Sequence, residues 1–122
     1  MTRKEALQDL LVKVKAGNAP EYSPFREAYV KTYWQAFDMK DQGIAWKAYN
    51  GSMDAALSLH EAVLPGWTWH GGQNAHHRDV TMWVRKSEDG AVTLEFNAYA
   101  ATPSRALLIA LLEALVAKDG DA

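Results

Sequence analysis

Hydrophobic residues alternate with polar ones in two stretches of the second half of the chain. Val80, Met82 and Val84 recur at every second position, and residues 91–100 repeat the pattern. A spacing of two places side chains on one face of a β-strand, so both stretches are predicted to be strands. Between them, a short polar segment ends in Gly90, which accepts the positive φ of a hairpin turn. The sequence therefore predicts an antiparallel hairpin.

The segment after the hairpin predicts a long apolar helix. Thr102 can accept a hydrogen bond from a free amide at a helix start, and Pro103 suits the first helical position. The helix is expected to run to about Ala117, with Arg105 and Glu113 as its charged residues before the end. Because it is apolar nearly all round, it must be covered on several sides, and we expect apolar surface to remain for a neighbour.

The first half of the chain predicts two helices. Thr2 and Glu5 have capping-box spacing, and Gly17 follows the last apolar position of the first helix. A second helix is predicted from Ser23 to about Met39, because aromatic residues recur there at helical spacing. Gly43 is expected to mark its end.

The middle of the chain carries weaker signals. Residues 44–49 fit an extended segment, an edge strand or a tucked loop. Ser52 can cap a third helix, in which His60 lies on the apolar stripe and is expected at the core or its rim, with one nitrogen hydrogen-bonded. A first strand is predicted from Trp67 to His70, with residues 71–79 forming an exposed loop.

These elements predict one α+β domain over residues 1–122. Its three-stranded antiparallel sheet would be packed by about four helices in the order α-α-α-β-β-β-α. The pattern leaves open a three-layer α/β/α arrangement, with helices on both faces of the sheet.

Composition narrows the classes of function. The 122 residues include no cysteine, which excludes disulfides and thiolate metal sites, and the net charge is −2. Nothing near the N-terminus reads as a signal peptide or membrane span, so we expect a cytoplasmic protein. A nearly neutral chain has no general attraction for a polyanion, which argues against nucleic acid as a partner.

Three segments together carry a resemblance to a known family. Residues 51–59, 64–69 and 100–115 resemble the phage α-β-α sandwich domain family, although Ser104 stands where that pattern has alanine. The likeness covers about the last seventy residues. It implies a phage or prophage origin, in the cytoplasm of a host bacterium, and it brings no catalytic residues or cofactor. We therefore expect no enzyme.

Two alternative functions rest on local features. Histidines and an acid gather at His70, His76, His77 and Asp79, which suggests a metal-binding loop, although their spacing matches no known metal signature. The order helix, three strands, helix is also that of double-stranded RNA-binding domains, but those place a lysine-rich helix start against phosphates. Here the corresponding start offers only Arg105.

Protein contact is the function that the residues favour. On the two main strands, the positions facing away from the predicted core combine aromatic and polar side chains, as interfaces do. The alternative is that helices from the N-terminal half cover them. We expect a non-enzymatic accessory protein that binds a host factor or defence protein, and a homodimer. The interface candidates are Trp83, Arg85, Glu95, Asn97 and Tyr99.

Overall fold

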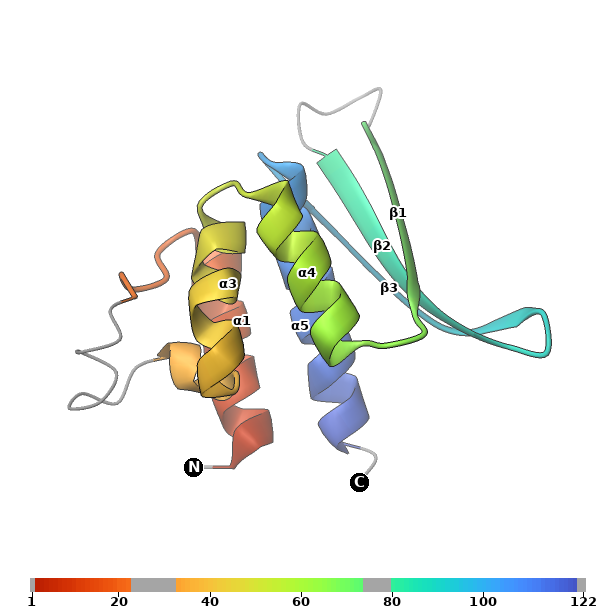
Figure 1. The fold of residues 1–122 in the computed structure, drawn as a ribbon, viewed down its shortest axis with the longest axis horizontal. Helices are drawn as coiled ribbons and strands as arrows, with labels where there is room; N and C mark the ends of the chain where they lie inside the picture. Colours follow the sequence, from red (N-terminus) through yellow and green to blue (C-terminus); the bar gives the residue numbers. More distant parts are fainter. Residues whose placement is uncertain (1, 23–32, 74–79, 121–122) are drawn as a thin grey trace.

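The computed structural model describes residues 2–22, 33–73 and 80–120. The predicted α+β class and the order α-α-α-β-β-β-α are confirmed (Figure 1). Among the described residues, one 3₁₀ turn, η1, lies between α1 and α3. The elements are α1 (Arg3–Ala16), η1 (Tyr33–Ala36), α3 (Met39–Tyr49), α4 (Met53–Val63), β1 (Thr68–Gln73), β2 (Val80–Glu88), β3 (Ala91–Ala100) and α5 (Pro103–Gly120).

Local capping fixes the helix starts that the sequence predicts. The Thr2 hydroxyl accepts a hydrogen bond from the Glu5 amide at 3.2 Å, and the Glu5 carboxylate closes the capping box. Gly17 ends α1 in the left-handed conformation, with φ 73°. At α4, the Ser52 hydroxyl accepts from the Ala55 amide at 3.1 Å. The predicted start of α1, its end at Gly17 and the predicted start of α4 are therefore confirmed.

The three strands form an antiparallel sheet in the order β1-β2-β3. The β2–β3 turn has positive φ at both Asp89 (53°) and Gly90 (80°), as a type I′ hairpin requires. Residues 71–73 of the predicted loop instead continue β1, and the rest of that loop, residues 74–79, lies outside the described residues. Gly71 pairs with Met82, and a Cβ there would overlap the Met82 sulfur, so a larger residue at this position would require the Met82 side chain to move.

The segment before α4 differs from the prediction. Residues 23–32 of the predicted second helix lie outside the described residues, and the next helix, α3, begins only at Met39. Gly43 therefore lies inside a helix, and residues 44–49 are helical rather than extended. The reason is tertiary: α3 buries Ala45 and Ala48 in the core, and that packing outweighs the cost of one glycine.

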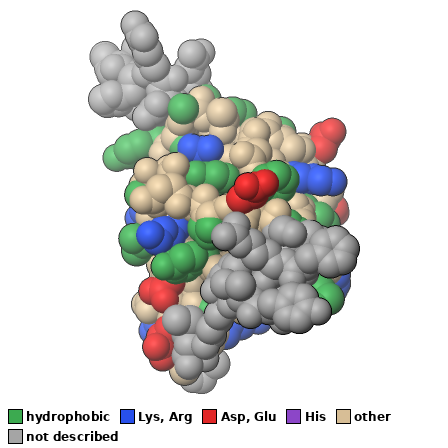
Figure 2. All heavy atoms as spheres, turned by 90° about the vertical axis from the view of Figure 1, so that its left-hand side faces the viewer, with side chains coloured by type: hydrophobic (Ala, Val, Ile, Leu, Met, Phe, Trp, Pro, Cys, Tyr) green, Lys and Arg blue, Asp and Glu red, His purple; other side chains and the backbone are tan. Residues whose placement is uncertain are grey.

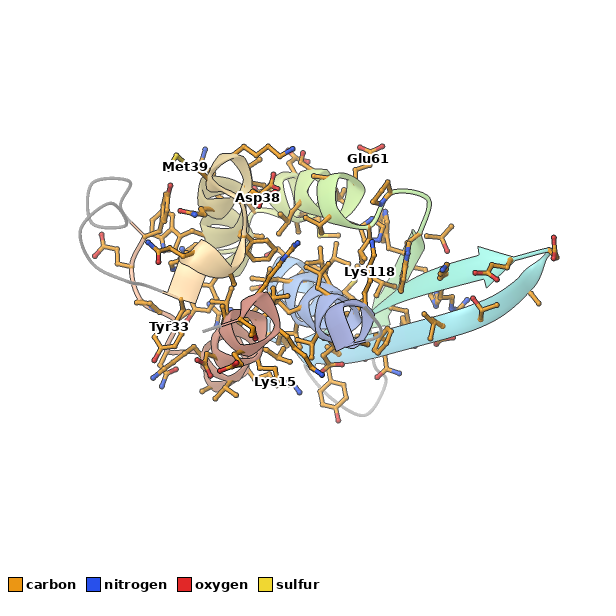
Figure 3. The ribbon with its side chains drawn as sticks, turned by 90° about the horizontal axis from the view of Figure 1, so that it is seen from below. Lys15, Tyr33, Asp38, Met39, Glu61 and Lys118 are labelled. Atoms are coloured by element: carbon orange, nitrogen blue, oxygen red, sulfur yellow. The ribbon has the colours of Figure 1, made fainter. Side chains whose placement is uncertain are left out.

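Helix α5 is the centre of the core. It contacts β2 and β3 on one side and α1, α3 and α4 on the other (Figure 3). Residues 106–112, 114 and 115 are all buried. The apolar surplus that predicted a neighbouring molecule is thus covered within the chain. The layers run sheet, α5, remaining helices, so the described helices all lie on one side of the sheet (Figures 1 and 3).

An aromatic cluster holds η1 and the N-terminal linker against the helices. Trp34, fully buried in η1, meets the Tyr49 ring edge-on at 5.9 Å between centroids, and its indole donates to the Pro20 carbonyl at 2.7 Å. The Tyr49 hydroxyl accepts from the Ala19 amide at 3.3 Å. Arg105 of α5 stacks on the same ring at 4.1 Å and donates two hydrogen bonds to the Tyr49 carbonyl. These contacts therefore join four segments around the Tyr49 ring: residues 19–20, η1, α3 and α5.

Candidate protein-contact surface

The face of the sheet that points away from α5 is the candidate site. Met82, Val84 and Ala98 are buried against the helices, so the alternate positions of the same strands point outward. We call this face the outer-sheet surface. The strand register arranges it in three rows, which are Thr68–Arg85–Glu95, His70–Trp83–Asn97 and Gly72–Thr81–Tyr99.

All five interface candidates from the sequence share this surface. Trp83 and Arg85 come from β2, and Glu95, Asn97 and Tyr99 from β3. Tyr99 is 68% exposed, and the described helices lie on the other side of the sheet (Figure 3). The alternative that N-terminal helices cover this face is therefore not what the described residues form.

His70 contributes a contact that the sequence did not predict. Its imidazole ring lies parallel to the Trp83 indole, with 4.6 Å between centroids and 8° between planes. The two residues are cross-strand partners, which is why their rings meet. The stack fixes the orientation of Trp83 and makes a flat aromatic platform in the middle row.

The neighbouring row is polar but electrically balanced. Arg85 Nε lies 3.1 Å from Glu95 Oε2, so the two charges of this row neutralise each other. Both side chains are about one third exposed, which leaves the pair accessible to a partner. The surface therefore combines aromatic faces, an amide and a neutral ion pair, a set that suits contact with another protein.

The described residues bring together no metal site. No group of three metal-ligating side chains occurs among them. Of the four metal candidates, His70 packs on Trp83, whereas His76, His77 and Asp79 lie outside the described residues. The metal-loop hypothesis is thus untested by this geometry.

Among the described residues, the cation at the start of α5 and those on the face drawn in Figure 2 form no cluster. Arg105, the cation at the start of α5, already donates to Tyr49 and stacks on its ring. On the face shown in Figure 2, the described lysines and arginines lie singly among hydrophobic and acidic side chains. Salt-dependent phosphate binding needs several neighbouring cations, so these positions give it little support.

His60 lies in the core and not at its rim, the two places that the sequence left open. It is 3% exposed on α4, and its Nε2 atom has no hydrogen-bond partner among the described residues. Burial lowers the pKa of His60 below 6.5, while the nearby Glu61 carboxylate acts in the opposite direction. The neutral imidazole is therefore the form that the folded protein prefers.

This burial predicts a pH-dependent stability. Because the unfolded chain binds the His60 proton more readily than the folded one, the free energy of unfolding should fall as the pH drops below 6.5 and stay level above it. Each unit of pKa depression is worth about 1.4 kcal/mol. Urea unfolding of the wild type and of His60→Leu, between about pH 5 and 7.5, measures this. In the variant, the free energy of unfolding should depend less steeply on pH below 6.5, because the contribution of His60 is gone. The same pH dependence in both proteins would contradict the prediction.

No protein-family model, curated protein or solved structure matches this chain. Within the described residues, no helix is both long and apolar enough to cross a membrane.

Proposed function

We propose that this chain is a non-enzymatic protein-contact module that binds another protein through the outer-sheet surface. The observation that carries the proposal is the His70–Trp83 stack beside Tyr99, on a face with no described helix over it. Large aromatic side chains ringed by polar groups are the usual anchors of protein interfaces.

The charges of this surface suggest the kind of partner. Arg85 and Glu95 neutralise each other, so the surface has no net charge with which to select a polyanion or a strongly charged protein. A partner with a mixed apolar and polar face would fit it best. Asn97, exposed beside the stack, can both donate and accept hydrogen bonds at its edge.

The resemblance of residues 51–59, 64–69 and 100–115 to the phage family supports a biological setting. We place the protein among phage or prophage accessory proteins, in the cytoplasm of a host bacterium, with a host factor or defence protein as the partner. Neither a catalytic group nor a cofactor is part of this proposal. The RNA-binding alternative is weakened by the engagement of Arg105 with Tyr49.

Site-specific photo-crosslinking in bacterial cells tests the proposal. A photoreactive phenylalanine derivative is placed at Tyr99, and at Val12 of α1 as a matched control, because the two positions are 68% and 65% exposed. We expect a discrete adduct with another protein from position 99 and none from position 12. An adduct of twice the 13.6 kDa chain mass reports self-association and does not count.

A second variant tests whether the crosslinked adduct depends on the aromatic platform formed by His70 and Trp83. Trp83→Ala should weaken binding by about 2 kcal/mol, which is roughly thirty-fold in affinity, and so should remove most of the adduct. Circular dichroism checks that the variant remains folded. Equal adduct patterns at positions 12 and 99, or an adduct indifferent to Trp83→Ala, would contradict the proposed surface.

A further inference from the structure

Strand β3 has an open edge without the usual protection against pairing. Among the described strands it pairs only with β2, so the backbone groups along its other edge have no strand partner within residues 2–22, 33–73 and 80–120. Its ten residues contain no proline or lysine, and Glu95 is its single charge. The register irregularity of the hairpin lies opposite Lys86 and Ser87, which leaves residues 94–100 regularly paired. Such an edge is a template for another strand.

A hollow lies beside this open edge. Its volume is about 330 Å³, and it is lined by Lys15 of α1, by Asn97, Ala98 and Tyr99 of β3, and by Ile109 and Glu113 of α5. No residue of β2 lines it, so it opens on the free side of β3. Lys15 Nζ pairs with Glu113 Oε1 at 2.8 Å, and Ala98, Ile109 and Tyr99 provide the apolar part of the lining. The hollow can receive one apolar side chain.

Strand β3 itself carries an exposed apolar side chain, Leu94, that can fill such a hollow. Leu94 is 40% exposed and lies four residues before Ala98, so both point to the α5 face of the sheet. If two copies of β3 pair antiparallel about a twofold axis at Phe96, Leu94 of each copy lies opposite Ala98 of the other. The pairing then places each leucine beside the hollow of its partner.

The remaining pairs of this register also match. Glu95 faces Asn97 of the other copy, so the carboxylate can accept from the amide while it keeps Arg85. An axis at Glu95 would instead set two carboxylates opposite each other, which is unfavourable. An axis at Asn97 would offer Phe96 to the hollow, but that ring is already stacked on Trp67 at 6.4 Å.

We propose that the occupant of the β3 edge is a second copy of this chain, paired antiparallel about Phe96. The two sheets join into one of six strands, and each Leu94 fills the partner's hollow. Even-numbered residues stay on the α5 side and odd-numbered ones on the outer side, so the two outer-sheet surfaces become continuous. This goes beyond the proposed function, because it names a contact that does not use the aromatic platform.

Light scattering and sedimentation of the full chain, over a wide range of concentration, test the pairing. The wild type should approach twice 13.6 kDa. Leu94→Ser empties the hollow, and Asn97→Glu sets two pairs of carboxylates face to face; each should weaken the dimer by at least about tenfold. Ser87→Glu, an exposed position on the same hairpin with the same added charge, should leave it unchanged.

A swap of the two side chains tests the register itself. In the double variant Glu95→Gln, Asn97→Glu, an amide again faces a carboxylate, so dimerisation should recover most of what Asn97→Glu alone loses. A purely structural effect of these exposed positions would not be rescued in this way. A wild type that stays monomeric, a dimer indifferent to Leu94→Ser, or a double variant no tighter than Asn97→Glu would each overturn the proposal.

Discussion

Replacing Leu111 by alanine is expected to lower the free energy of unfolding by about 3 kcal/mol. Leu111 is fully buried in α5, the helix that touches the sheet on one side and three helices on the other. The loss combines the transfer free energy of the missing methyl groups with the cavity that rigid neighbours on both sides leave unfilled. Chemical denaturation followed by circular dichroism measures it.

The matched control for this prediction is Val12→Ala on α1. Val12 is 65% exposed, so its truncation removes little buried area and should change stability by less than about 0.5 kcal/mol. A Leu111→Ala loss no larger than that of Val12→Ala would mean that α5 is not the centre of the core.

The second large effect is expected at Trp34. Alanine at this position should cost about 4 kcal/mol, because the side chain is fully buried and forms an edge contact with Tyr49. Trp34→Phe separates packing from hydrogen bonding, since it keeps a buried ring but deprives the Pro20 carbonyl of its donor. That variant should lose only about 1–2 kcal/mol.

Denaturation of the two Trp34 variants provides the measurement. If Trp34→Phe is as damaging as Trp34→Ala, the hydrogen bond to Pro20 matters more than the packing. If both are nearly neutral, the aromatic cluster does not hold η1 against α3 and the linker at residues 19–20. The second result would overturn the interpretation of this cluster as the point where the segments are joined.

Much of the fold follows from local signals. The capping box at Thr2, the cap at Ser52 and the turn at Asp89–Gly90 are all set by a few neighbouring residues, and each was predictable. The alternation on β2 and β3 also gave the correct faces, because a strand period of two needs no knowledge of the partner strand. The five interface candidates were therefore found on one surface.

Helix α3 shows where such reasoning fails. Its buried side includes Asp41 and Gln42 besides Ala45 and Ala48, so the inner face did not read as an apolar stripe. The Gln42 side chain donates to the Phe37 carbonyl at 3.1 Å, and this contact makes burial of the amide possible. Only the folded arrangement supplies that partner.

The chain by itself determined the capped helix starts, the hairpin turn and the two faces of the sheet, since caps, turns and strand alternation act over a few residues. Tertiary structure alone decided that α5 is enclosed by its own chain, that His70 stacks on Trp83, and that a hollow opens beside β3. Those features depend on segments far apart in sequence, such as Lys15 and Glu113, and a periodic pattern holds no information on which distant surfaces meet.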